Sequence, residues 1–231
     1  MSRPDDLLCY EVIYQETDLF CCTSEDLRKT IEGRVLHYRN QLDTYVGERP
    51  EFLKSLAPIP FDPLAPRIAK EMMRAAASIG VGPMACVAGA VAEFVGRDVN
   101  PLTDEYIIEN GGDIYLRTRR ERNVVIYAKD SPYSKKIGIR IGPSEDALGI
   151  CTSSATVGPS LSLGKADAVC VLSHSALFAD GLATRIGNMV GREDDIEAAL
   201  EDGKRFPDVV GILIIMGKSL GVWGNIDLIE V

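Results

Sequence analysis

The sequence has few of the residues that build zinc sites, because it contains only two histidines and no Cys-x-x-Cys pair among its six cysteines. Structural zinc sites need closely spaced cysteine and histidine ligands. It also has no run of about 18 apolar residues, the length that a membrane-spanning helix requires, and no charged-then-apolar leader. These absences predict no zinc site, no membrane span and a reducing, cytoplasmic location.

Basic residues are also in deficit, since 25 Lys and Arg stand against 34 Asp and Glu, for a formal net charge of -9. An acidic surface repels phosphate backbones, so no nucleic-acid partner is expected. The nearest approach to a basic patch is Arg117, Arg119, Arg120 and Arg122. We interpret it as the solvated end of a hairpin.

Hydrophobic patterning predicts a mixed α/β (α+β) fold, with one domain over residues 1–231 and a mixed sheet flanked by helices. β-Branched and aromatic segments predict strands at 8–14, 19–23, 106–109, 114–117, 124–128, 137–141, 168–172, 209–216 and 226–229. Apolar residues three and four apart predict a helix from an N-cap at Ser24 to Gly47, and others over 68–79, 86–95, 175–190 and 194–200.

Three polar side chains surround two glycines in the segment Glu109-Asn110-Gly111-Gly112-Asp113. Adjacent glycines supply the positive φ of a tight turn. They also let the backbone approach a phosphate or ribose closely. The residues alone leave both readings open, a plain hairpin turn and a ligand-binding turn.

A second polar run, Thr152, Ser153 and Ser154, continues to Thr156 and Ser160 among glycines. Its hydroxyl and backbone donors suit a phosphate, while its composition equally suits a surface loop. Cys151 opens this run, but a nucleophilic cysteine needs a neighbouring base or positive charge to lower its pKa. No such partner is adjacent in sequence, so we do not expect Cys151 to be a nucleophile.

Asp180 and Thr184 are four residues apart on a predicted helix, so they share one face. A carboxylate and a hydroxyl on one face suit Mg²⁺ that also keeps waters and a substrate phosphate. The alternative is a solvated polar face, or a Thr184 hydroxyl bonded to its own helix. Neither His37 nor His174 is expected to be catalytic.

Five motifs together resemble a known family, the ApbE-like superfamily, whose best-known members are FAD:protein FMN transferases. They occur in order at 82–85 (Gly-Pro-Met-Ala), 109–114, 149–154, 164–169 and 179–184. The set is most similar to a shorter branch of the superfamily. The resemblance implies an ApbE-type α/β fold, an FAD site and a Mg²⁺ at the diphosphate.

The resemblance also implies roles for the residues of these motifs. Gly111 to Asp113 border the flavin-nucleotide pocket, with Glu109 and Asn110 beside them. Thr152 to Ser154 match a strand end on the substrate side. Asp180 and Thr184 match the metal ligands of the Asp-x-x-x-Thr motif.

One departure concerns residues 158–162, Gly-Pro-Ser-Leu-Ser, where transferases of the family carry a His-x-x-Asp-Pro-like segment. The catalytic residues therefore stay unassigned. Three functions remain open: a transferase or diphosphatase acting on FAD, with a protein as one acceptor; a non-catalytic module for a flavin or small nucleotide; and a metal-assisted enzyme for another metabolite, using Cys151 or His174. The Ala/Gly-rich segment 85–92 fits a monomer core or a homo-oligomer contact.

Overall fold

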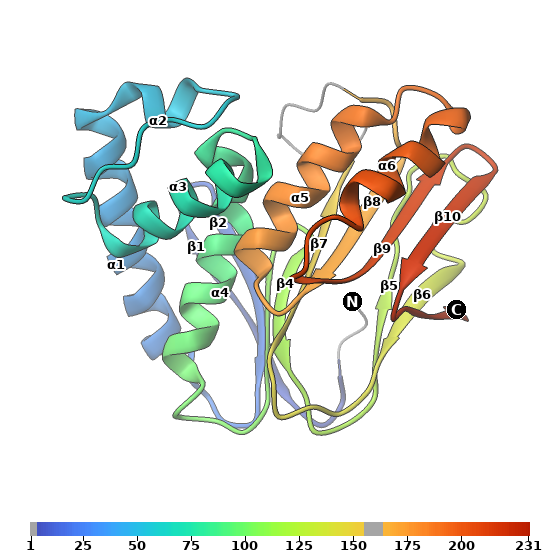
Figure 1. Cartoon of the computed structure of the whole chain (residues 1–231). Coiled ribbons are helices and arrows are strands. Elements are labelled where there is room, and N and C mark those ends of the chain that lie inside the picture. Colours follow the sequence, from blue (N-terminus) through green and yellow to red (C-terminus); the bar gives the residue numbers. More distant parts are fainter. Residues whose placement is uncertain (1–3, 155–163) are drawn as a thin grey trace.

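The computed structural model describes residues 4–154 and 164–231 (Figure 1). Its helices are α1 (Arg28–Glu48), α2 (Pro50–Lys54), α3 (Arg67–Ile79), α4 (Val87–Val99), α5 (Ala176–Met189) and α6 (Ile196–Gly203), with single 3₁₀ turns η1 (Pro83–Cys86) and η2 (Glu193–Asp195). The strands are β1 (Leu8–Tyr14), β2 (Thr17–Thr23), β3 (Tyr106–Asn110), β4 (Asp113–Arg117), β5 (Arg122–Val125), β6 (Ile137–Ile141), β7 (Leu148–Ser153), β8 (Ala168–Ser173), β9 (Val209–Met216), β10 (Ser219–Gly224) and β11 (Asp227–Glu230).

The strands form two sheets, one of eight strands in the order β1-β2-β3-β4-β7-β8-β9-β10 and one of three in the order β11-β6-β5. Every ladder between described strands is antiparallel. The mixed α/β class is confirmed. The expectation of a mixed sheet is corrected, because hairpins and long antiparallel connections join all the neighbouring strands.

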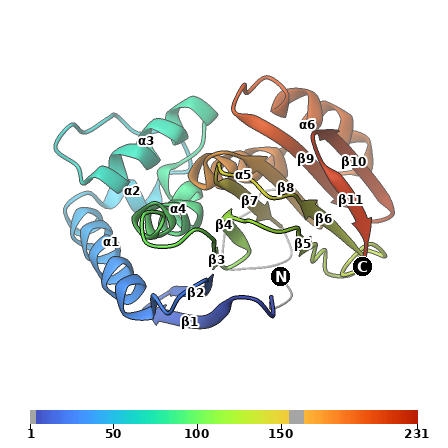
Figure 2. The ribbon, with the colours of Figure 1, turned by 90° about the horizontal axis from the view of Figure 1, so that it is seen from below.

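The long sheet is buried on both faces, which explains its nearly continuous apolar strands. In β8, Val169 and Val171 pack with the helices, while Ala168, Cys170 and Leu172 pack toward the small sheet. Because successive side chains of a strand point to opposite faces, one strand contributes to two cores. Figure 2 shows the helices on one face of the long sheet and β5, β6 and β11 on the other.

Most elements follow the patterns that predict them, with three differences in the described residues. The sequence pattern predicts no helix at Pro50–Lys54, where the structure has α2. α1 begins at Arg28 after Leu27 and has no side-chain cap, so Ser24 is not its N-cap. β10 was not expected, because its sequence Ser-Leu-Gly-Val-Trp-Gly is half-exposed and carries two glycines. It pairs with β9 at the edge of the long sheet.

Helices α3 and α4 are separated by a sharp bend. α3 ends at Ile79 and is capped by Gly80, whose φ of +86° is a left-handed conformation that favours glycine. Within 4–154 and 164–231, no single helix is long and apolar enough to cross a membrane. α3 together with Pro83–Val99 meets the length and composition only as a pair bent by 104°.

The six cysteines fall into two groups. Cys9 and Cys22 lie opposite each other on β1 and β2 and form a disulfide. Cys21, Cys86, Cys151 and Cys170 are free and buried, as expected for core thiols. Spacing alone did not reveal the bonded pair, because its formation depends on the hairpin register.

The arginine cluster is not uniformly solvated, which corrects the sequence interpretation. Arg122 is only 9% exposed and forms a bidentate ion pair with Asp6 and a second ion pair with Glu105. Arg117 donates to the backbone carbonyls of Asn100 and Thr103. These side chains therefore stabilise the fold, and Arg119 and Arg120 remain exposed.

Candidate functional site

The Glu-Asn-Gly-Gly-Asp segment is a two-residue hairpin turn between β3 and β4. Gly111 and Gly112 have φ values of +63° and +104°, and Asn110 pairs with Asp113 across the turn. The Asn110 side chain donates to the Ala88 carbonyl at 3.1 Å, which ties the turn to α4. The glycines form a hairpin turn, and the flanking side chains reach other elements.

Asp113 connects this turn to the end of β7. Its Oδ1 accepts a hydrogen bond from the Thr152 backbone N–H at 3.1 Å, and the side chain is buried, with 7% exposure. β4 pairs with β7 through Ile114 and Ile150, so Asp113 lies one step beyond, beside Cys151. The structure thus joins two of the motifs that the sequence singles out.

Asp180 lies on α5, the helix that contacts both α4 and β7. Its Oδ2 accepts from the Gly89 backbone N–H at 3.0 Å. A Cβ on Gly89 would lie 2.3 Å from the Ala176 carbonyl oxygen and 2.8 Å from the Asp180 Cβ. Only glycine therefore lets α4 approach α5 closely enough for this bond.

The two carboxyl groups share a poorly solvated environment. Burial, opposed by the hydrogen bonds to Thr152 and Cys151, raises the pKa of Asp113 to about 7. Burial and the nearby Asp113 charge raise the pKa of Asp180 well above its usual value, although Asp180 as a whole residue is only partly buried. The Asp113 charge therefore destabilises the charged form of Asp180, and the Glu109 charge adds to the rise in the pKa of Asp113.

No basic side chain of the described residues forms an ion pair with Asp113 or Asp180. Of the two segments whose structure is not described, 155–163 contains no Lys, Arg or His, and 1–3 contains Arg3. Buried charges are ordinarily paired or bound to a metal. The pair is therefore suited to a cation that comes from outside the chain.

The other predicted site residues lie around this pair or outside the described ranges. Thr184 is half-buried, one helical turn beyond Asp180. Ser153 ends β7 against α5, and Ser154 is buried. Thr156, Ser160 and the departure at 158–162 lie outside the described residues.

Two buried thiols complete the surroundings. The Cys151 Sγ donates to the Ala176 carbonyl at 3.2 Å. Burial and the Asp113 and Asp180 charges raise the pKa of Cys151 well above its usual value. Burial and the Asp180 charge also raise the pKa of Cys86. Both thiols stay protonated at neutral pH, so neither has the character of a nucleophile.

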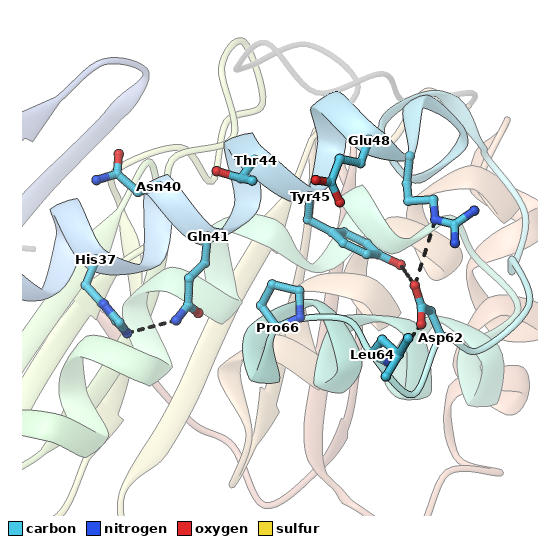
Figure 3. Close-up of a pocket in the computed structure, with 10 residues that line it drawn as sticks. His37, Asn40, Gln41, Thr44, Tyr45, Glu48, Asp62, Leu64 and Pro66 are labelled. Atoms are coloured by element: carbon cyan, nitrogen blue, oxygen red, sulfur yellow. Dashed lines mark hydrogen bonds and ion pairs between the residues drawn. The ribbon is translucent and has the colours of Figure 1, made fainter.

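Two cavities in the described residues lie apart from these carboxylates. One, of about 560 Å³, lies between α1 and the segment 62–66, where Tyr45 donates to Asp62 and His37 contacts Gln41 (Figure 3). The second, of about 490 Å³, includes His174 on its lining, between the ends of the two sheets. We place the candidate site at Asp113 and Asp180, because two carboxyl groups with no ion-pair partner among the described residues are the stronger chemical signal.

Sequence reasoning missed the α4 side of this site. Gly89 supplies the N–H that holds Asp180, and Glu93 binds the N-terminus of α5 through the Ser175 hydroxyl and the Leu177 N–H. The small residues of 85–92 were the only available signal. Part of that segment packs inside the described chain against α5.

The arrangement of layers defines an ApbE-like fold. The apo flavinyl transferase ApbE of Pseudomonas stutzeri matches with a TM-score of 0.60 at 13% identity, covering 96% of both chains. An apbe protein of Thermotoga maritima matches with a TM-score of 0.57 at 12% identity, covering 93% of this chain and 96% of that one. At such identities the likeness concerns the fold alone.

The family follows from sequence. A family model described as AbpE bacteria matches residues 3–220, so the chain belongs to this family within the ApbE-like superfamily. It is 42% identical over 200 residues to a UPF0280 protein of Methanococcus aeolicus, covering 84% of this chain and 81% of that protein. It is 40% identical over 223 residues to one of Methanopyrus kandleri, covering 93% and 89%. The resemblance read from the five motifs is confirmed.

Proposed function

We propose that this chain is a Mg²⁺-dependent flavin-nucleotide-binding protein that cleaves FAD and transfers FMN to an acceptor. The observation that carries the proposal is the pair Asp113 and Asp180, two carboxyl groups that each accept a backbone N–H and form no ion pair among the described residues. Solved structures of the same fold are named flavin transferases, which supports the flavin part of the proposal.

The donor set fits a hard cation. The Asp180 carboxylate interacts with the backbone N–H groups of Gly89 and Ala88, and the Thr184 hydroxyl lies on the same helix face. Mg²⁺ prefers such oxygen ligands and keeps several sites for water and substrate phosphate. No three His, Cys, Asp or Glu side chains of the described residues are grouped to hold a metal. Substrate oxygens would therefore complete the coordination.

Each part of the site has a defined task in the proposed reaction. When bound, Mg²⁺ neutralises charge on the diphosphate. The Gly111–Gly112 turn brings the backbone close to the nucleotide, and Thr152 to Ser154 offer hydroxyl and N–H donors. The anhydride bond of FAD breaks, the FMN phosphorus bonds to an acceptor oxygen that releases its proton to solvent, and AMP leaves with its phosphate. A protein hydroxyl or water serves as the acceptor.

The alternative is a flavin-binding module without turnover. The module is supported because neither candidate acid/base residue is available at the carboxylates. Burial and the neighbouring charges raise the pKa of the Cys151 thiol, and His174 lines the second cavity instead. The same arrangement argues against the metal-assisted reaction that would recruit either of them. Cleavage of FAD separates the transferase from the module.

The first test is a titration of the metal-stripped protein with FAD, with and without Mg²⁺, followed by chromatography for FMN and AMP. We expect saturable binding that Mg²⁺ strengthens, together with AMP release. Binding without AMP would favour the module. No binding in either condition would contradict the proposal.

Asp180→Asn is expected to weaken Mg²⁺ binding by tenfold or more, on the order of the loss seen when metal-site residues are changed. The amide oxygen still accepts from Gly89, so the fold should be retained. The matched control is Asp18→Asn on the exposed part of β2. If calorimetry gives the two variants equal Mg²⁺ affinity, Asp180 is not a ligand of the cation.

A further inference from the structure

The disulfide between Cys9 and Cys22 joins an edge strand to its neighbour, far from the carboxylates. Among the described strands β1 pairs only with β2, and Figure 2 shows it at the outer edge of the long sheet. Cys22 is fully buried beside Ile107, in the core between the two sheets, while Cys9 packs at the rim of that core and is half-buried. Solvent therefore reaches the bond from the Cys9 side.

None of the four free thiols is placed to exchange with this disulfide. Cys21 is next to Cys22 in the chain, but it points to the opposite face of the sheet and packs with the helices. Burial raises the pKa of Cys21 to about 12. Cys86, Cys151 and Cys170 are also buried, and 1–3 and 155–163 contain no cysteine. Because exchange needs an accessible thiolate, the thiol that reduces the disulfide must come from outside the chain.

Apart from the disulfide, few side chains hold β1 on the sheet. Leu8 and Ile13 are 53% and 65% exposed. Only Tyr10 and Val12 of the strand are buried, on the helix side, and the Tyr10 hydroxyl shares a hydrogen bond of 2.9 Å with Thr23. A strand with few buried contacts at a sheet edge opens locally at a lower free energy than the central strands do. The disulfide is therefore the main restraint on the opening of β1.

We propose that Cys9 and Cys22 form a thiol–disulfide switch, which holds β1 on β2 when oxidised and lets β1 open when a small thiol reduces it. This inference does not depend on the proposed function. A small thiolate attacks the Cys9 Sγ and forms a mixed disulfide, and the released Cys22 thiolate takes up a proton. A second small thiolate displaces the Cys9 thiolate, which is also protonated. Two small thiols thus become one disulfide while the protein gains two thiols, and a small disulfide reverses the reaction.

The experiment treats the folded full-length protein first with oxidised and then with reduced glutathione. Alkylation after denaturation, read by mass spectrometry, should count four thiols in the oxidised protein and all six cysteines in the reduced one. On reduction, amide hydrogen exchange in β1 should accelerate by about tenfold or more, while exchange in the central strand β8 stays unchanged. The melting temperature should fall by roughly 6–12 °C, the scale for opening a disulfide loop of this size in a domain of this length.

Two variants assign the response to this pair of cysteines. Cys9→Ser should exchange like the reduced wild type under both conditions. Cys21→Ala removes the neighbouring thiol outside the pair and should keep the full response to glutathione.

Three results would overturn the switch. Six alkylated cysteines after treatment with oxidised glutathione would mean that the disulfide does not form. A disulfide that small thiols reduce only in the unfolded protein would be a permanent link. Equal exchange of β1 in the oxidised and reduced proteins would mean that the disulfide does not control the opening of this strand. Loss of the response in Cys21→Ala would place the reactive pair elsewhere and overturn the assignment as well.

Discussion

Replacing Glu93 by alanine should lower the free energy of unfolding by about 3 kcal/mol, the scale for removing one partner of a buried ionic network. Glu93 is 1% exposed and lies on α4. Its Oε2 accepts from the Ser175 hydroxyl at 2.8 Å and from the Leu177 N–H at 2.9 Å, and its other oxygen pairs with Arg97. Urea denaturation with circular dichroism measures the change.

Glu93→Ala is expected to be this costly because α5 has no negative charge of its own at its N-terminus. The first turn of α5 contains no acidic residue, although a negative charge there stabilises a helix. Glu93 supplies that charge from α4. In Glu93→Ala a buried N–H loses its acceptor, and desolvated donors cost more than a bond in water.

Glu71→Ala is the matched control, because Glu71 also pairs with Arg97, at 2.7 Å, but is 23% exposed. It should cost no more than about 1 kcal/mol, as exposed ion pairs do. Glu93→Gln should fall between the two, since its amide oxygen can accept one of the bonds. Equal losses in Glu93→Ala and Glu71→Ala would mean that Glu93 does not cap α5.

The secondary structure was predictable where one local pattern decides it. Residues 168–172 form an uninterrupted apolar strand, and the spacing of apolar residues along α1 marks its buried face. β10 could not be predicted, because this edge strand has no alternation of hydrophobic and polar residues. Patterning also does not state strand direction, so the antiparallel order of the long sheet had to come from the structure.

The candidate site was predictable in its parts but not in its connections. Helix geometry alone places Asp180 and Thr184 on one face. The bond from Gly89 to Asp180 joins residues 91 positions apart, and the bond from Leu177 to Glu93 joins residues 84 positions apart. No local pattern encodes such pairs, because they depend on how α4 and α5 cross. The proximity of Asp113 to Asp180 was unavailable for the same reason.

Gly89 lies where α4 crosses α5, and Gly89→Ala should lower the free energy of unfolding by about 3 kcal/mol, at the upper end of overpacking effects. The added Cβ would meet the Ala176 carbonyl carbon at 2.7 Å and its oxygen at 2.3 Å. These are backbone atoms, which cannot rotate away as a side chain can. Relief requires α4 and α5 to separate, and the Gly89 N–H then moves away from Asp180.

Gly33→Ala is the control, because Gly33 is exposed within α1 and a Cβ there would meet no atom within 4 Å. It should raise the free energy of unfolding by about 0.5–1 kcal/mol, the helix preference for alanine over glycine. If Gly→Ala lowers the free energy of unfolding at position 89 and raises it at position 33, the loss at Gly89 comes from its close packing. Because Gly89 also holds Asp180, its variant should lose Mg²⁺ affinity even at temperatures where it remains folded. A Gly89→Ala protein with unchanged stability and unchanged Mg²⁺ affinity would refute the close approach of the two helices and its role in orienting Asp180.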